Sequence, residues 1–160
     1  MLKFLNSLSP FIEDNYQELG VREYARIVGV SPPTASKILS RYEVEGLLIS
    51  RKDRKYIFYR ANRESMQLLD LTKVYWRTKA KQLVEFLKEE FVHANITLFG
   101  SLTKLETKNE SDIDLYVDAR GKSIDLGKFE RKMKRKIQLQ FKNAMSNRNL
   151  KRNVDRGVVL

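Results

Sequence analysis

Two short stretches in the second half of the sequence combine residue types suited to phosphate and metal chemistry. Gly100-Ser101 follows a short apolar run. A glycine there lets the backbone turn closely around a phosphate, and a helix starting at this point would add amide donors. Asp112 and Asp114 are two residues apart on a predicted strand, so their side chains point to the same face. Two carboxylates on one face suit Mg²⁺ ions that clamp a triphosphate and its attacking hydroxyl. The spacing therefore predicts a site for a metal-bound, phosphate-bearing ligand.

The passage that carries both stretches, LFGSLTKLETKNESDIDLYV, resembles the minimal branch of the DNA polymerase beta-like nucleotidyltransferase superfamily, and the resemblance extends over residues 80–160. It implies that Gly100 and Ser101 hold nucleotide phosphates, and that Asp112 and Asp114 bind Mg²⁺ and form the catalytic pair. A nucleoside triphosphate would be the ligand or the substrate. Related minimal transferases act as antitoxins beside a HEPN-type toxin, so the resemblance also suggests such a toxin as a partner.

Two positions depart from the pattern of that superfamily. Leu105 stands where a small glycine is usual, four residues after the serine. Gln138 occupies the place on a later strand where a third carboxylate is expected, and neither Asp118 nor Asp125 lies on that strand. An amide cannot supply the negative charge that completes a metal cage or activates a hydroxyl. We therefore expect nucleotide and metal binding without efficient transfer, and enzyme activity stays open.

A second set of residues, between positions 31 and 55, is suited to binding DNA. An α-helix fits the major groove, where its first residues reach base edges, and cations on a neighbouring hairpin tip suit phosphates or the minor groove. A solvated tip is the alternative for such a charged run, but the two helices before it favour DNA contact. The candidate residues are Ser31, Thr34, Ser36, Lys37 and Arg41 on the helix, and Arg51, Lys52, Arg54 and Lys55 at the tip.

The elements that would position these DNA contacts are a helix, a turn, a second helix and a hairpin. Residues 21–28 carry apolar side chains at helical spacing, and Gly29 ends that helix. Ser31 caps the second helix, which runs to about Glu45, and two strands with period-2 alternation follow. The passage VREYARIVGVSPPTASKILSRYEVEGLLISRKDRKYIFYRAN resembles winged-helix regulators of the MarR and ArsR type. The whole chain resembles archaeal proteins that fuse such a domain to a minimal nucleotidyltransferase.

The rest of the chain alternates helical and strand patterns. Residues 63–92 predict one long helix, or two with a bend near Thr78. The segments ITLF, DIDLYVD and KIQLQF predict strands, and a basic helical tail follows. We expect an α+β protein with two small domains, in which a winged helix-turn-helix precedes a minimal nucleotidyltransferase fold of a short mixed sheet with flanking helices. The expected boundaries are 1–63 for the DNA-binding domain, 64–79 for a linker or dimer helix and 80–160 for the second domain.

Composition narrows the classes of function. The net charge of +11 over 160 residues favours a polyanionic partner, with double-stranded DNA the first candidate. The absence of cysteine excludes disulfides and thiolate zinc sites, and a single histidine, His93, excludes His-rich metal sites. The first residues are too weakly patterned for a signal peptide, and no apolar run approaches the length of a membrane helix. We expect a cytoplasmic protein that makes no membrane contact.

The helix at 64–79 bears an apolar stripe formed by Leu68, Leu71, Tyr75 and Trp76. The stripe either packs the two domains together or forms a dimer face. Because palindromic operators favour two-fold proteins, we expect a homodimer.

Two functions remain in competition. The first is a DNA-binding transcriptional regulator whose degenerate nucleotidyltransferase-like domain senses a nucleotide or mediates dimerisation. The second is an active, metal-dependent nucleotidyltransferase that transfers a nucleoside monophosphate to a protein or nucleic acid and is targeted by its winged helix. Gln138 favours the first.

Overall fold

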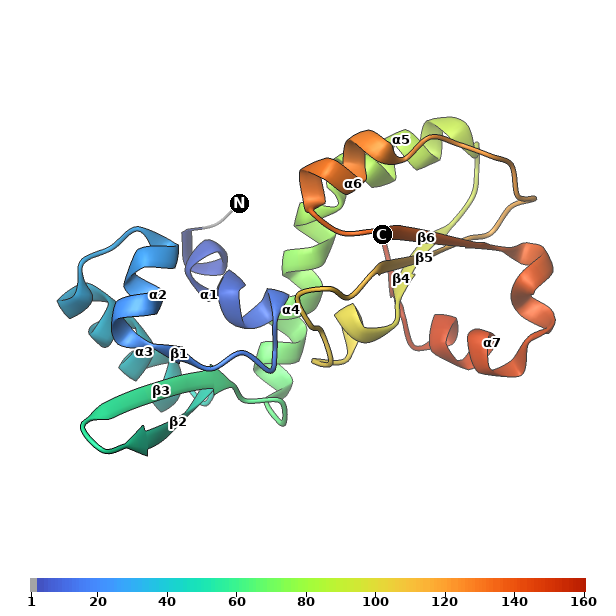
Figure 1. Cartoon of the computed structure of the whole chain (residues 1–160). Coiled ribbons are helices and arrows are strands. Elements are labelled where there is room, and N and C mark those ends of the chain that lie inside the picture. Colours follow the sequence, from blue (N-terminus) through green and yellow to red (C-terminus); the bar gives the residue numbers. More distant parts are fainter. Residues whose placement is uncertain (1–2) are drawn as a thin grey trace. The chain divides into compact units, whose positions relative to one another are not determined.

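The chain folds into two units, each built around its own small sheet (Figure 1). The computed structural model describes residues 3–160, over which seven α-helices and seven short strands alternate in an α+β arrangement. Unit 1 contains the residues up to Tyr75 together with Leu105–Asn109, and unit 2 contains Trp76–Lys104 and Glu110–Leu160. The boundary thus falls inside one helix, and one short segment of the later sequence belongs to unit 1.

Unit 1 has the element order of a winged helix-turn-helix. Its three strands pair antiparallel in the order β1-β3-β2, with β2 and β3 forming the hairpin. The helices are α1 (Lys3–Glu13), α2 (Val21–Val28), α3 (Pro32–Val44) and the first part of α4 (Met66–Lys79), and the strands are β1 (Leu19–Gly20), β2 (Leu48–Asp53) and β3 (Tyr56–Ala61). The fold expected from the sequence is confirmed, while α1 and β1 are additional elements that the sequence patterns did not reveal.

The turn between α2 and α3 is fixed by residues at its two ends. Gly29 has φ 72 and ψ 37, a left-handed conformation that glycine adopts without steric cost and that ends α2. The Ser31 hydroxyl accepts a hydrogen bond from the Thr34 amide, and Pro32 opens α3 where no amide donor is needed. Tyr24 and Leu39 are then buried in the core between the helices.

Residues 105–109 pack as part of unit 1, although they follow the Gly100-Ser101 turn in the sequence. Asn15 and Thr107 are both fully buried, and two hydrogen bonds join them. The Asn15 amide donates to the Thr107 carbonyl at 2.9 Å, and the Thr107 amide donates to Oδ1 of Asn15 at 2.8 Å. Nε of Arg63 also donates to the Leu105 carbonyl at 2.9 Å. Polar groups buried in this way need such partners, so the segment is held firmly.

Unit 2 contains a four-stranded mixed sheet in the order β6-β5-β4-β7, in which β5 and β6 run parallel and the other pairs antiparallel. Its helices are α5 (Lys81–Glu90), α6 (Gly127–Met133) and α7 (Arg148–Asp155), with 3₁₀ turns η1 (Ser101–Thr103) and η2 (Lys142–Ser146). Its strands are β4 (Ile96–Phe99), β5 (Ile113–Val117), β6 (Ile137–Phe141) and β7 (Val158–Val159).

The two faces of this sheet differ in what covers them. Helices α5 and α6 lie on one side and α7 lies on the other (Figure 1). On the α7 side, Val154 packs with Phe99 and Tyr116 of the sheet. Because side chains alternate along a strand, Asp114 shares the face of Tyr116, two residues away. The carboxylate pair therefore belongs to the same face as α7, at the end where β5 begins.

No helix between residues 3 and 160 is both long enough and apolar enough to span a bilayer.

Candidate functional sites

The residues predicted for phosphate and metal chemistry come together across three neighbouring strands of unit 2. Asp112 directly precedes β5 and Asp114 is its second residue. In the strand register, Asp114 is opposite Phe99 of β4 on one side and Gln138 of β6 on the other. The sheet thus places Asp114 beside the end of β4, from which the Gly100 turn continues.

Gly100 occupies a position that only glycine can fill. Its φ of 82 and ψ of −153 lie in a region closed to other residues. A Cβ atom at this position would overlap Oδ2 of Asp114. The turn therefore lies directly against the carboxylate. Ser101 then begins η1, a single 3₁₀ turn of three residues rather than an α-helix.

Gln138 lies at the carboxylate pair, as the resemblance to the nucleotidyltransferase superfamily implied. Nε2 of Gln138 donates a hydrogen bond to Oδ2 of Asp112 at 2.5 Å. The other two acids considered as replacements are bound elsewhere. Asp118 accepts from the Tyr116 hydroxyl at 3.1 Å and pairs with Lys142 at 3.5 Å, and Asp125 accepts from the Gly127 amide at 2.8 Å. The third position of the site is therefore an amide that satisfies Asp112.

Electrostatics at Asp114 favour a bound cation. Burial of the Asp114 carboxyl raises its pKa above the usual value, and the negative charge of Asp112 raises it further. A divalent cation would offset both effects, and carboxylate oxygens are the ligands that Mg²⁺ prefers. Among residues 3–160, however, no cluster of three or more acids, histidines or cysteines could hold a metal. Asp112 and Asp114 could hold one divalent ion, and the described residues place Gln138 rather than a third carboxylate beside them.

Leu105, the other departure from the superfamily pattern, has a left-handed backbone with φ 55 and a buried side chain. That conformation costs a residue other than glycine about 1–2 kcal/mol, which explains why a small glycine suits this position. In this chain the burial of the leucine side chain in unit 1 offsets the backbone cost.

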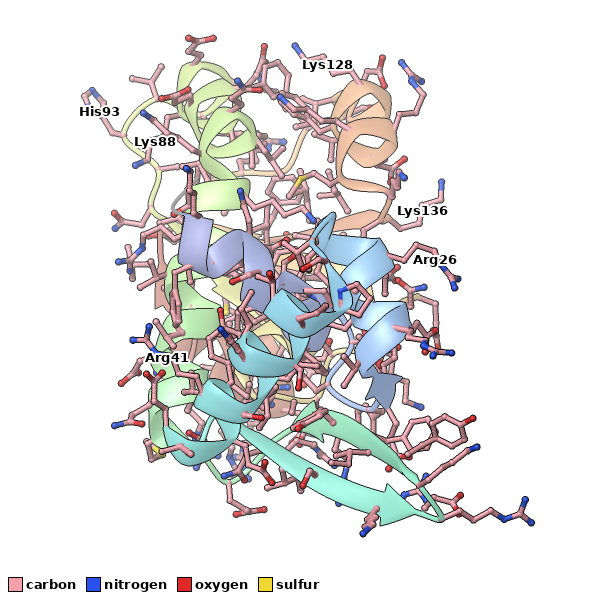
Figure 2. The ribbon with its side chains drawn as sticks, turned by 90° about the vertical axis from the view of Figure 1, so that its left-hand side faces the viewer. Arg26, Arg41, Lys88, His93, Lys128 and Lys136 are labelled. Carbon is pink, nitrogen blue, oxygen red and sulfur yellow. The ribbon has the colours of Figure 1, made fainter. Side chains whose placement is uncertain are left out.

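The first turns of α3 present the residues predicted for base contact. The side chains of Ser31, Thr34, Ser36 and Lys37 are all exposed, and the hydroxyls of Ser31 and Thr34 bond to each other at 2.9 Å. Arg41 projects from the surface (Figure 2), but its Nε pairs with Glu45 at 2.7 Å. Any contact between Arg41 and a phosphate would compete with this ion pair.

The wing is the tip of the β2–β3 hairpin, residues 51–55, and it carries four cations. Three of them have no acidic partner in the described chain. Arg54, with φ 54, forms the turn of the hairpin together with Lys55, and Lys52 is exposed on β2. Arg51 differs, because it pairs with Glu18 at 2.7 Å and with Asp53 at 3.5 Å. A contact between Arg51 and a phosphate would therefore compete with these two ion pairs.

A hollow of about 540 Å³ and another of about 630 Å³ lie on the surface of unit 1. The larger one adjoins the wing and includes two cations of α2, Arg22 and Arg26, which the sequence analysis did not single out. Their spacing of four residues on a helix was an available signal, because it places both on one face.

The apolar stripe on α4 is used inside the monomer, which corrects the basis of the expected dimer face. Leu68, Tyr75 and Trp76 are all at most 3% exposed, and Leu71 is partly buried. The apolar side chains that α4 leaves exposed are instead Met66 and Val74.

Comparison with known proteins agrees with this geometry for the second unit. Residues 81–159 match the family model described as polymerase beta, nucleotidyltransferase, so the C-terminal part of the chain is a nucleotidyltransferase-like domain. Among solved structures, NolR from Sinorhizobium fredii is similar with a TM-score of 0.32 and 21% identity, over 56% of this chain and 81% of that one. The fold of unit 1 rests on its own topology rather than on so low a score. No curated protein matches the chain significantly.

Proposed function

We propose that this protein is a DNA-binding regulator whose nucleotidyltransferase-like domain binds a nucleotide with one divalent cation and transfers its nucleotidyl group poorly, if at all. The observation that carries the proposal is the hydrogen bond from Gln138 to Asp112. An amide at this position leaves a site that can still bind a cation but has lost an anionic ligand and a general base. Loss of general-base help typically costs ~10²–10⁴ in rate.

Each residue of the site has a part in binding. Asp112 and Asp114 would hold Mg²⁺, which when bound would neutralise and orient the phosphates of a nucleoside triphosphate. Gly100 lets the turn lie against the Asp114 carboxylate, because a side chain there would overlap Oδ2 of Asp114, and phosphates bound to the cation would thus lie beside this turn. Ser101 follows at the start of η1, where it would contact those phosphates.

DNA binding is supported by the arrangement of unit 1. Exposed hydroxyls and a lysine occupy the first turns of α3, as expected of a helix whose N-terminal part enters the major groove. Lys52, Arg54 and Lys55 of the wing are exposed beside it and suit phosphate contact. Nucleotide binding in unit 2 would then serve as a signal to the regulator.

Calorimetry with ATP and MgCl₂ tests the nucleotide part. The natural chain is expected to bind the complex, and the double variant Asp112→Ala with Asp114→Ala is expected to lose binding. A matched control, Glu89→Ala with Asp155→Ala, removes the same charge from exposed positions elsewhere in unit 2 and should bind normally. If the natural chain releases no heat of binding, the sensing function is wrong.

An active nucleotidyltransferase, acting on a protein or nucleic acid, is the second candidate. What favours it is that the glycine turn and both aspartates are present in a domain that matches the polymerase beta family. Incubation with labelled nucleoside triphosphates and Mg²⁺ distinguishes the two. Gln138→Asp should raise or create transfer, because it restores a carboxylate beside Asp114. Efficient transfer by the natural chain would favour the enzyme over the sensor.

A further inference from the structure

A strongly basic segment of unit 2 has no part in the function proposed above. Residues 127–136, GKFERKMKRK, contain six lysines and arginines and one acid, a net charge of +5 within a chain whose total is +11. Nearly half of the excess positive charge of the protein is thus concentrated in ten residues. Five of the cations are exposed, and we call them the cationic ledge: Lys128, Arg131, Lys132, Lys134 and Lys136.

The fold fixes which side chains of this segment face solvent. Phe129 and Met133 are buried one helical turn apart on α6, so the residues between them face outward. Lys134 has a left-handed backbone with φ 53 and ends the helix. Arg135 is buried, donates from Nη1 to the Ser111 carbonyl at 2.7 Å, and lies over the Trp76 ring. Arg135 therefore anchors the segment, and the other five cations are left at the surface.

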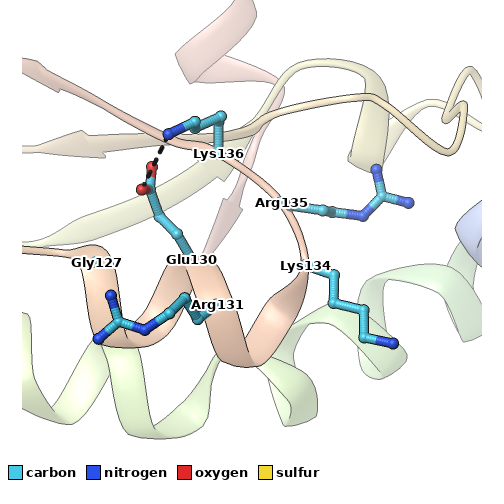
Figure 3. Close-up of a pocket in the computed structure, with 6 residues that line it drawn as sticks. All are labelled: Gly127, Glu130, Arg131, Lys134, Arg135 and Lys136. Carbon is cyan, nitrogen blue, oxygen red and sulfur yellow. Dashed lines mark hydrogen bonds and ion pairs between the residues drawn. The ribbon is translucent and has the colours of Figure 1, made fainter.

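The single acid of the segment compensates little of this charge. Glu130 accepts a hydrogen bond from the Ile137 amide at 3.0 Å and pairs with Lys136 at 3.4 Å (Figure 3). Within residues 3–160, neither Arg131 nor Lys134 is ion-paired with an acid. Both line a hollow of about 440 Å³ together with Gly127, Glu130, Arg135 and Lys136. The ledge thus has a concave part whose positive charge is only partly balanced.

The ledge adjoins the candidate nucleotide site through the backbone. The Ile113 amide donates to the Lys136 carbonyl at 2.8 Å, and Arg135 holds the carbonyl of Ser111, the residue before Asp112. Lys128 and Lys136 project from the ribbon near the two ends of the segment (Figure 2). The positive surface therefore begins where β5 and β6 begin, at the end of the sheet that carries Asp112.

We propose that the cationic ledge binds the phosphate backbone of a nucleic acid, independently of the winged helix. Protein interfaces have an apolar centre, whereas binding to the phosphate backbone of a nucleic acid depends mainly on lysine and arginine and needs no apolar surface. None of the large apolar side chains that are exposed in the described chain lies within residues 127–136. This charge without apolar surface fits a phosphate backbone better than an acidic protein. Binding at the ledge would place a strand next to the nucleotide site.

The test uses the whole 160-residue chain. In it, Lys52→Ala, Arg54→Ala and Lys55→Ala remove the unpaired cations of the wing. Fluorescence anisotropy is measured with short single-stranded RNA, single-stranded DNA and duplex DNA at several salt concentrations. In this background, Arg131→Gln with Lys134→Gln should weaken binding about tenfold and reduce the salt slope by about 1.4–1.8, for two lost phosphate contacts. The three probes show which nucleic acid the ledge prefers.

The matched control is Lys151→Gln with Arg152→Gln, which removes the same charge from exposed positions on α7. It should change binding less than twofold by the same reasoning about phosphate contacts. Arg131→Lys, which keeps the charge, should retain most of the affinity, and circular dichroism checks that each variant is folded.

Three results would overturn the proposal: no residual binding in the wing background, an equal loss in the control, or a polyglutamate peptide that competes as well as RNA. The assay contains no nucleoside triphosphate and leaves Asp112 and Asp114 intact. A failure of the ledge is therefore distinct from a failure of nucleotide binding, which calorimetry reports separately.

Discussion

The position of Asp114 in the sheet disfavours ionisation of its carboxyl group. It is partly buried beside Asp112, and both factors raise the pKa of its carboxyl, burial more strongly. A carboxyl with a raised folded-state pKa contributes stability that is fully present below its unfolded pKa. That contribution is lost as the pH rises through the folded pKa. At neutral pH without a cation, the ionised side chain therefore destabilises unit 2.

The first prediction follows from this destabilising negative charge. Asp114→Asn should raise the melting temperature of the metal-free protein at neutral pH by about 1–3 °C, a small effect because solvent screens the partly exposed group. The gain should disappear in acid, below the usual pKa of aspartate. Mg²⁺ with ATP should stabilise the natural chain and leave the variant unchanged. Thermal unfolding monitored by circular dichroism across pH measures both effects, and a variant less stable at neutral pH would contradict the assignment.

For single residues, sequence and structure agree best where the register between strands determines which side chains lie together. Alternation along β5 put Asp112 and Asp114 on one face, and Gln138 falls opposite Asp114 because β5 and β6 are in parallel register. The ion pairs could not be foreseen. Arg51 and Glu18 are far apart in the sequence and meet only after unit 1 folds. Only the structure therefore shows that Arg51 would have to leave an ion pair in order to bind a phosphate.

Among the elements, the β2–β3 hairpin gives the clearest prediction. Lys52, Arg54 and Lys55 should contact phosphates, whereas Arg51 is held by Glu18. Changing these three cations to alanine should lower the salt slope of duplex DNA binding by about 2.7, at roughly 0.9 for each lost contact. Arg51→Ala alone should have a much smaller effect. Titrations at several salt concentrations measure both slopes, and an unchanged slope for the triple variant would remove the wing from the interface.

The segment 105–109 gives a prediction about stability. Asn15→Ala removes the side chain that accepts from the Thr107 amide, and leaves this buried donor without its partner. Such a loss typically costs about 1–3 kcal/mol. Denaturant unfolding should show a decrease of this size. Asn6→Ala, at an exposed position of α1, is the control and should change stability little. Equal stability of the Asn15 variant and the natural chain would show that the segment is not firmly held.

Elements with local signals were predicted well, and those that depend on distant contacts were not. The ends of α2 and α3 follow from Gly29 and Ser31, whose preferences act within a few residues. By contrast, β7 is two residues long and exists only because Val158 and Val159 pair with β4, about sixty positions earlier in the chain. The membership of residues 105–109 in unit 1 is likewise set by Asn15 and Arg63, which no local pattern connects to them.

At the scale of the whole molecule, each unit carries a surface of positive charge with little acidic compensation. One is the wing in unit 1 and the other is the cationic ledge in unit 2. Because the net charge is +11, nonspecific attraction to any polyanion adds to both. Variants with matched changes in charge are therefore needed to separate specific contacts from this background.

The last prediction concerns oligomeric state. Operators with two-fold symmetry are bound by two-fold proteins, so we expect a homodimer through unit 1. The residues that first suggested a dimer face are buried in the monomer, but α4 still exposes Val74, beside a hollow that Phe4, Leu47 and Leu71 also line. Light scattering should give twice the monomer mass of 18.8 kDa at micromolar concentration.

Val74→Glu should restore the monomer mass, because a charge in an apolar interface is costly. The control Val92→Glu changes a more exposed valine of unit 2 and should remain dimeric. A natural chain that scatters as a monomer would contradict the dimer, and an unaffected Val74→Glu dimer would locate the interface elsewhere.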